Sequence, residues 1–289
     1  MRKTATQKKG RWGSAFLALM LLFMYAPIAV LILYSFNENK SMASWGGFSL
    51  KWYGELFQDA QIMDALWVTI QIAVLSALVA TVIGTAAAIG INAMGKRSRG
   101  AIMGITNLPV VNPDLVTGVS LMLLYVSLFS FLNGIPAIAD FLARFGIRLQ
   151  LGYGTLLASH ITFNIPYVIL SVMPRLRKSS NTLYDAAMDL GARPMYALWR
   201  VVLPDIAPGM VTGFILAFTV SRDDFVVSFF TRQGVQNLSI VIYSLARRGI
   251  KPKINALSTL MFVTVLALLL LVNIRSARAA KKEKALARR

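Results

Sequence analysis

The chain has 289 residues, of which 56% are hydrophobic and only 15% are charged, which is too apolar for the surface of a water-soluble domain of this length. The absence of cysteine excludes disulfides, thiol catalysis and cysteine-ligated metals, and the single histidine leaves little for a histidine-based metal site or catalytic triad. The formal net charge of +18 fits either a nucleic-acid binder or a membrane protein, so the positions of the charges must decide.

Six segments are apolar over about 20 residues or more, the length that crosses a bilayer. The first lacks a small-residue cleavage site and is too long for a removed signal peptide, so we expect a retained anchor. The pattern predicts an all-α membrane protein with six transmembrane helices and a transmembrane domain over residues 12–274, flanked by tails at 1–11 and 275–289. The predicted spans are residues 12–36, 65–93, 101–132, 152–173, 209–230 and 254–274.

Positive charge divides unequally between the two sides that these spans define. The side with both termini and the loops 94–100 and 175–207 carries 20 Lys and Arg residues, and the opposite loops carry 9. Because positive loops stay in the cytoplasm, both termini are predicted to be cytoplasmic, in a multi-pass protein of the cell membrane. The charge then serves topology and attraction to lipid headgroups, and a nucleic-acid partner is not expected.

Two patterns in the spans predict close or irregular packing. Glycines spaced four residues apart, Gly100 with Gly104 and Gly209 with Gly213, permit close contact between helices. The third span carries Pro109 and the pair Asn112–Pro113 before a carboxylate, and proline removes backbone donors. Irregular backbone in a membrane has to face protein or a water-lined cavity, so Asp114 is expected to face the bundle interior.

Three carboxylates, Asp114, Asp223 and Asp224, lie within predicted spans, where each costs about 2.5–3.5 kcal/mol at the bilayer centre. A structural explanation for these carboxylates is that Arg222 neutralises one of them and that the others lie at a water-filled edge. A functional explanation is that they attract a cationic substrate. The energetic cost of keeping three carboxylates in the spans favours the functional explanation. Ser221, Asp224 and Ser228 have the spacing of one helical face. We predict a substrate path along Asp114, Asp223, Asp224, Ser221 and Ser228. His160 is expected to bond between helices rather than to contact a ligand.

The cytoplasmic segment 175–208 has internal structure of its own. Leu183, Ala186, Ala187 and Leu190 mark one face of a short helix, Gly191 predicts a left-handed stop, and Pro194 predicts a second helix that Pro204 ends. The apolar faces have to be covered by the bilayer, by the chain's own bundle or by a cytoplasmic partner. A near match to a nucleotide-binding loop at residues 90–97 fails because it follows a membrane span and has Arg97 in place of a hydroxyl. No ATP site is expected in this chain.

Residues 185–192 (DAAMDLGA), followed by residues 201–204 (VVLP), resemble the EAA loop of ABC-transporter permeases, with Asp185 in place of Glu and Val201 in place of Ile. Further segments are similar to permeases of spermidine/putrescine importers, most of all to the second of the two permeases. Arg222 departs from that family by replacing a commonly apolar residue. The similar segments are residues 25–27, 34–37, 52–56, 113–114, 159–163, 216–227 and 255–257.

The resemblance implies a type I ABC importer bundle and a polyamine-translocating permease subunit, without catalytic or metal-binding residues. It implies a second permease, two ATP-binding subunits that use ATP and Mg²⁺, and an extracytoplasmic solute-binding protein. It assigns coupling to the ATPase to Asp185, Ala186, Ala187, Gly191, Leu203 and Pro204. The alternatives are an ABC permease for ferric iron or a phosphonate, where Arg222 would favour an anion, and a stand-alone cation/proton symporter. Charged residues within the spans sum to −2, which argues against an anion path.

Overall fold

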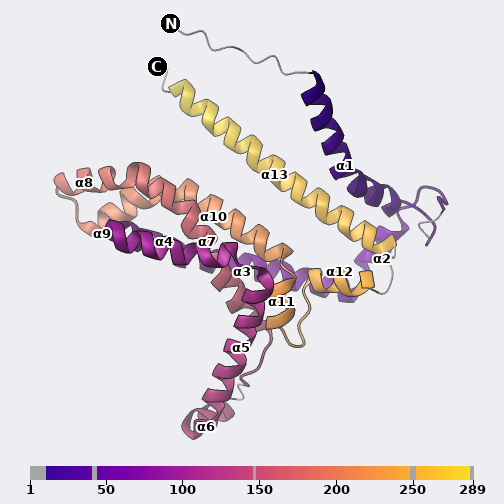
Figure 1. The fold of residues 1–289 in the computed structure, drawn as a ribbon, viewed down its shortest axis with the longest axis horizontal. Helices are drawn as coiled ribbons and strands as arrows, with labels where there is room; N and C mark the ends of the chain where they lie inside the picture. The colour runs from indigo at the N-terminus through magenta and orange to yellow at the C-terminus, as the bar shows by residue number, and fades with distance from the viewer. Residues whose placement is uncertain (1–10, 41–43, 146–147, 248–251, 287–289) are drawn as a thin grey trace. The chain divides into compact units, whose positions relative to one another are not determined.

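The computed structural model describes residues 11–40, 44–145, 148–247 and 252–286, and the regular structure in these ranges is helical apart from one bridge between Asn37 and Phe48 (Figure 1). This confirms the all-α class. The chain divides into two compact units: a middle unit of residues 64–241, and a terminal unit of residues 1–63 with 242–289. The predicted 1–11 tail lies outside the described residues except for Arg11, and the 275–289 tail continues a helix as far as Leu286.

The terminal unit consists mainly of α1 (Arg11–Ser35), α2 (Lys51–Phe57) and α13 (Pro252–Leu286), with α1 and α2 packed against α13. Buried Trp52 donates from Nε1 to the Asn37 carbonyl at 2.6 Å. Lys253 donates to Asp59 at 2.9 Å, and this hydrogen bond lowers the pKa of the Asp59 carboxyl. These contacts hold the segment between α1 and α3 against the start of α13.

The middle unit contains the helices that build the candidate site. The most extensive contacts between its helices join α7 to α10 and α5 to α11. Three pieces, η1, η2 and α9, are single helical turns. In chain order the helices are α3 (Ala60–Ala93), α4 (Lys96–Val111), α5 (Asp114–Asn133), α6 (Pro136–Arg144), α7 (Tyr153–Arg175), η1 (Leu176–Ser180), α8 (Asn181–Asp189), α9 (Pro194–Ala197), η2 (Leu198–Val202), α10 (Leu203–Asp223), α11 (Val226–Thr231) and α12 (Leu238–Arg247). The boundaries of the unit at residues 64 and 241 fall inside α3 and α12.

Within the described residues, five helical segments are long and apolar enough to cross a membrane: Gly13–Ser35, Ala60–Ala93, Asp114–Asn133, Tyr153–Lys178 and Pro194–Asp223. The first, second and fourth predicted spans fall in the first, second and fourth of these. The sixth predicted span falls in α13, which is apolar over Pro252–Ala267.

The third predicted span, residues 101–132, is interrupted where its prolines predicted irregular backbone, whereas the fifth, residues 209–230, is wrong as one continuous helix. The first is cut between α4 and α5, where Asn112 and Pro113 have extended backbone. Proline disfavours the helical conformation of the residue before it and offers no N–H, which favours a helix end at this position. The other is cut at Asp224, which is also extended, between α10 and α11. Each break places an aspartate at a helix end.

Glycines allow α3, α7 and α10 to meet closely around Val168 of α7, which is fully buried. A Cβ placed on Gly84 of α3 would lie 2.8 Å from the Val168 Cβ, and one on Gly213 of α10 would lie 3.2 Å from the Val168 Cα. Gly209 likewise faces α7, because a Cβ placed on it would lie 3.2 Å from the Ser171 carbonyl oxygen. The predicted close contact at Gly209 and Gly213 is therefore confirmed. Gly100 and Gly104 have open space around them among the described residues.

We predict that Gly213→Leu lowers the stability of the purified chain and that Gly104→Leu does not. A larger side chain at position 213 forces α10 away from α7, at a cost of about 1–3 kcal/mol for overpacking. Thermal unfolding in detergent, followed by circular dichroism, measures both. Equal midpoints for the two variants would show that the α7–α10 contact does not depend on the glycine.

Candidate functional site

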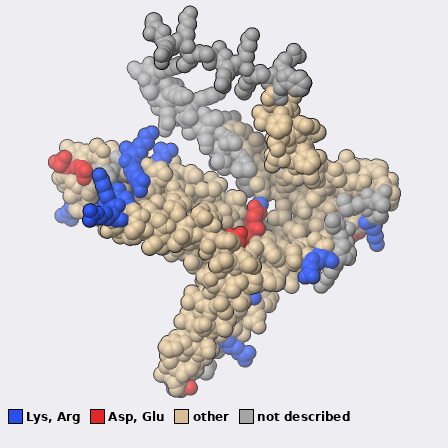
Figure 2. Space-filling view, in the orientation of Figure 1, with Lys and Arg blue, Asp and Glu red and all other residues tan. Residues whose placement is uncertain are grey.

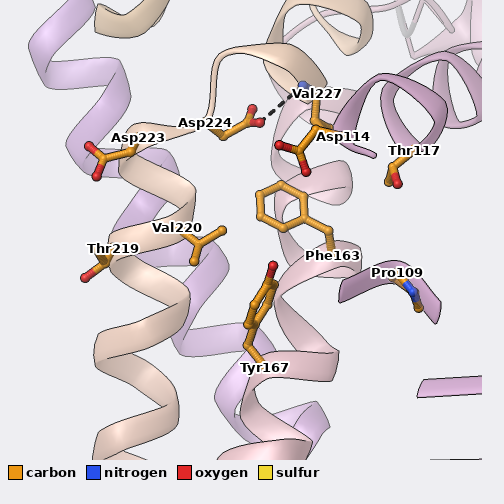
Figure 3. Close-up of a pocket in the computed structure, with 10 residues that line it drawn as sticks. All are labelled: Pro109, Asp114, Thr117, Phe163, Tyr167, Thr219, Val220, Asp223, Asp224 and Val227. Atoms are coloured by element: carbon orange, nitrogen blue, oxygen red, sulfur yellow. Dashed lines mark hydrogen bonds between the residues drawn. The ribbon is translucent and has the colours of Figure 1, made fainter. Parts of the chain in front are cut away.

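The two helix breaks lie on one cavity of about 320 Å³ in the middle unit (Figure 3). Asp114 begins α5, and Asp223 and Asp224 lie where α10 stops. Figure 3 shows the Asp114 and Asp224 side chains turned toward each other beyond the ring of Phe163. The cavity therefore combines carboxylates with aromatic faces. Its lining residues are Pro109, Asp114, Thr117, Phe163, Tyr167, Thr219, Val220, Asp223, Asp224 and Val227.

Asp224 is held by hydrogen bonds to the start of α11. Its Oδ1 accepts from the backbone N–H of Val227 at 3.2 Å, and its Oδ2 accepts from the N–H of Ser228 at 2.8 Å and from the Ser228 hydroxyl at 2.8 Å. The side chain is 7% exposed. A carboxylate at this position caps the helix and lies at its positive end. The negative charge is thus stabilised by dipoles next to the cavity.

Arg222 pairs with Asp223, through both its Nε at 2.9 Å and a terminal guanidinium nitrogen. Of the possible counter-ion pairs, the structure forms Arg222–Asp223, in which the Asp223 side chain is 54% exposed. Within the described part of the chain, no Lys or Arg forms an ion pair with Asp114 or Asp224. The expected neutralisation by Arg222 thus applies to Asp223, and not to Asp114 or Asp224.

The predicted single helical face of Ser221, Asp224 and Ser228 is wrong, because the helix stops before Asp224. The three residues still come together, through His160 of α7. The ring Nδ1 lies 2.6 Å from the Ser221 hydroxyl and Nε2 lies 2.9 Å from the Ser228 hydroxyl. His160 is 1% exposed, which confirms the expectation that it bonds between helices.

Several site residues escaped the sequence analysis. Tyr167 and Phe163 are one turn apart on α7 and contribute aromatic faces to the cavity. Their i, i+4 spacing indicates a shared helix face. The sequence does not indicate that this face points toward the cavity. Asn237 is buried, and its side-chain amide donates to the Ser228 hydroxyl at 2.8 Å. Ser76 of α3 lies 3.0 Å from the Ser221 hydroxyl. A serine within an apolar span was the only sequence feature that could have pointed to the pairing of Ser76 with Ser221.

The segment after α7 contains the residues predicted for coupling. Gly191 has φ of +82°, and the N–H groups of Gly191 and Ala192 bond the carbonyls of Met188 and Ala187 at 2.9 and 3.0 Å. This is the Schellman pattern of a left-handed helix stop, as predicted. Asp185, Ala186 and Ala187 lie on α8, and Pro194 occupies the first turn of α9 as predicted.

Pro204 does not end a helix, so that prediction is wrong. The chain stays helical from Pro194 to Asp223, and Leu203 and Pro204 form the first turn of α10. The proline follows the π-helical turn Leu198–Val202, where the hydrogen-bond ladder already changes, so its missing N–H is tolerated. Consequently α9, η2 and α10 form one continuous rod that joins this segment to the cavity at Asp223.

Large apolar side chains remain uncovered on this segment. Leu190 beside the glycine stop is 90% exposed, and Trp199 is 63% exposed. Met195 and Tyr196 between them are also exposed. Residues 90–97 run from the end of α3 into α4 and follow a helix rather than a strand, so the nucleotide-binding loop is not formed there.

We predict that Asp224→Asn destabilises the chain by about 1 kcal/mol, because an amide cannot accept both backbone N–H bonds of the cap. Adding Arg222→Leu should not restore stability, since Arg222 pairs with Asp223. Asp223→Asn is the matched control and should cost less, because that side chain is half exposed. Thermal unfolding of the single and double variants checks this; recovery in the double variant would mean that Arg222 and Asp224 are the true pair.

Residues 80–281 match the family described as binding-protein-dependent transport system inner membrane component. The chain is 37% identical over 256 residues to the putrescine transport system permease protein PotI of Escherichia coli strain K12, covering 88% of this chain and 86% of that protein. It is 34% identical over 260 residues to the spermidine/putrescine permease PotC of Haemophilus influenzae, covering 89% and 93%.

Among solved structures, the fold is similar to a chain of a bacterial ABC transporter that imports the acidic polysaccharide alginate. The TM-score is 0.64 at 20% sequence identity, covering 91% of this chain and 93% of that one. At this identity the likeness concerns the fold. The helical bundle, its apolar spans and the matched sequence agree with the predicted multi-pass permease of the type I ABC importer fold. The chain belongs to the family of inner membrane components of binding-protein-dependent transport systems.

Proposed function

We propose that the chain is the permease subunit of an ATP-driven importer that carries polyamines into the cell. The observation that supports this most is the pair of carboxylates, Asp114 and Asp224, on one cavity at two helix breaks without a Lys or Arg partner among the described residues. Relatives that cover nearly the whole chain are permeases for putrescine and spermidine.

The chemistry of the cavity suits a flexible chain of ammonium groups. Carboxylates accept charge-assisted hydrogen bonds from ammonium N–H groups, and the rings of Phe163 and Tyr167 offer faces that attract cations. A few separate contacts suit transport better than one tight cage, since the cargo has to be released. We assign the substrate path to Asp114 and Asp224, with Asp223 at its edge as the partner of Arg222. Ser221 and Ser228, which were also predicted for the path, are buried outside the cavity lining and are connected to it through Asp224 and His160.

A phosphonate is less well served by the cavity, because no Lys or Arg is among its described lining residues and the neighbouring Arg222 already pairs with Asp223. Ferric iron would also bind carboxylates, so the uptake experiment described below is needed to distinguish it from a polyamine as the cargo. A stand-alone symporter has no use for the structured segment around Gly191, whereas an ATP-driven importer needs a segment on which its ATPase docks.

The proposed partners are a second permease, two ATP-binding subunits and an extracytoplasmic solute-binding protein. The family name itself includes a binding protein, and an alginate transporter with a chain of similar fold has been solved in complex with its periplasmic protein. We propose that the ATPase docks on Asp185, Ala186, Ala187 and Gly191, beside the exposed side chains of Leu190 and Trp199. Movement there would reach the cavity through the helical rod that starts at Pro194 and includes Leu203 and Pro204. ATP and Mg²⁺ would bind the partner ATPase.

We also propose that both termini are cytoplasmic. Exposed basic side chains gather over the end of the middle unit that carries α8 and α9 (Figure 2). Positive residues at span ends mark the cytoplasmic side, and the same side holds the predicted docking segment. The exposed basic residues of the segments at this end include Lys96, Arg97, Arg175, Arg177, Lys178, Arg193 and Arg200.

Radiolabelled polyamine uptake tests the cargo. In cells without their own polyamine importers, the assembled transporter should take up spermidine or putrescine, and Asp114→Asn should reduce uptake about tenfold, as expected for loss of a hydrogen bond to a charged group. Labelled phosphonate and ferric citrate serve as the competing cargoes. Uptake of either one in place of a polyamine would refute the proposed substrate class.

Gly191→Val tests the coupling role. The left-handed backbone at this position strains a β-branched residue by about 1–2 kcal/mol, so co-purification of the ATPase and uptake should both fall while membrane insertion persists. Gly95→Val is the matched control, because Gly95 has φ of −61° and open space around it. Normal uptake with Gly191→Val would argue against docking at this turn.

Reporter fusions test the orientation. A reporter that works only in the cytoplasm should be active when fused after Arg289, because the loops on that side carry 20 of the Lys and Arg residues against 9 opposite. The paired fusion with an export-dependent reporter should be silent. The opposite pattern would overturn the orientation and remove the docking segment from the cytoplasm.

A further inference from the structure

A chain of side-chain hydrogen bonds runs through the middle unit from α3 to the cavity. It joins Ser76, Ser221, His160, Ser228 and Asp224 in that order, across distances of 3.0, 2.6, 2.9 and 2.8 Å. The first four side chains are at most 2% exposed. Neither the carboxylate path nor the coupling segment explains why a buried histidine occupies its centre.

The direction of the chain follows from the protons available at Ser228. Its hydroxyl has one proton, and an ionised Asp224 carboxylate can only accept, so Ser228 donates to Asp224. The amide of Asn237 also donates to the Ser228 oxygen, at 2.8 Å. The orientation of this amide is fixed, because its Oδ1 accepts from the N–H of Ile240. Ser228 has then no proton left for His160.

His160 must therefore donate from Nε2 to Ser228. In the neutral ring this leaves Nδ1 without a proton, so Nδ1 accepts from Ser221 at 2.6 Å. Ser221 has used its own proton and accepts from Ser76 in turn. Every hydrogen bond of the chain then points toward Asp224, and aligned hydrogen bonds of this kind strengthen one another in a medium of low dielectric.

We propose that His160 is a positioning residue that acts as the neutral Nε2–H tautomer and commits the Ser228 proton to Asp224. The ring Nε2 is 3.7 Å from the carboxylate Oδ2, too far for a direct hydrogen bond, so the effect passes through Ser228. The device holds a buried negative charge with dipoles instead of a Lys or Arg, which leaves that charge free to meet a cation in the cavity. The tautomer itself does not depend on which cargo the transporter carries.

The single histidine of this chain makes the tautomer directly measurable. The full-length chain, labelled with ring-¹⁵N histidine, purified through a histidine-free tag and placed in lipid bilayers, gives signals from His160 alone. The proposal expects a protonated Nε2 and a bare Nδ1 near neutral pH. A protonated Nδ1, or a doubly protonated ring, would overturn it, because the chain would then run the other way or end in an ion pair.

Two sets of variants separate positioning from packing. Ser228→Ala removes the acceptor of Nε2 and should shift the ring toward the Nδ1–H tautomer, while Ser171→Ala, whose hydroxyl bonds its own helix at 2.8 Å, should not. An unchanged tautomer in Ser228→Ala would refute control by Ser228. For transport, His160→Gln keeps a donor able to reach Ser228 and should retain about tenfold more uptake than His160→Asn, which is shorter. Equal uptake at equal expression would mean that His160 only fills space.

Discussion

The close approach of α3, α7 and α10 is the constraint on which the site depends. Val168 fits between Gly84 and Gly213; a Cβ on Gly84 would clash with its side chain, and one on Gly213 would press on its backbone. Asn164 and His160 lie one and two turns earlier on the same face of α7, and both are buried. The glycine contacts therefore bring the polar face of α7 within hydrogen-bond distance of Ser76 and Ser221. In lipid, such packing and polar contacts replace the hydrophobic effect as the force between helices.

The helix breaks turn this packed bundle into a site. A continuous α10–α11 helix would place the Asp224 carboxylate on a helix surface, where it could not cap the following turn. With the break, the backbone N–H groups of Val227 and Ser228 are available to it. The break before Asp114 brings a second carboxylate to the same cavity. Stabilisation by dipoles lowers the cost of a charge near the membrane interior and does not cancel its attraction for a cation.

Local sequence signals predicted the helical class, most spans, the left-handed stop at Gly191 and the close contact at Gly213. These predictions succeed because the length of an apolar segment, a glycine or a proline determines the conformation of the residues next to it in the chain. Local signals could not show that the helix is interrupted at Asp224, because this residue ends α10 by accepting hydrogen bonds from the first turn of α11. The pairing of Arg222 with Asp223 rather than Asp224, and the meeting of Ser76 with Ser221 across 145 residues, depend on how helices pack. The bonding role of His160 was predicted, but its partners could be named only from the structure.

The central claim is that the cavity between the two helix breaks receives the cationic cargo. A cryo-EM structure of the assembled transporter, trapped with spermidine and a non-hydrolysable ATP analogue, tests it most directly. The account predicts density for an extended polyamine at the cavity, with amine groups within hydrogen-bond distance of Asp114 and Asp224 and beside the ring of Tyr167. Cargo density along another face of the bundle, with these carboxylates remote from it, would contradict the account.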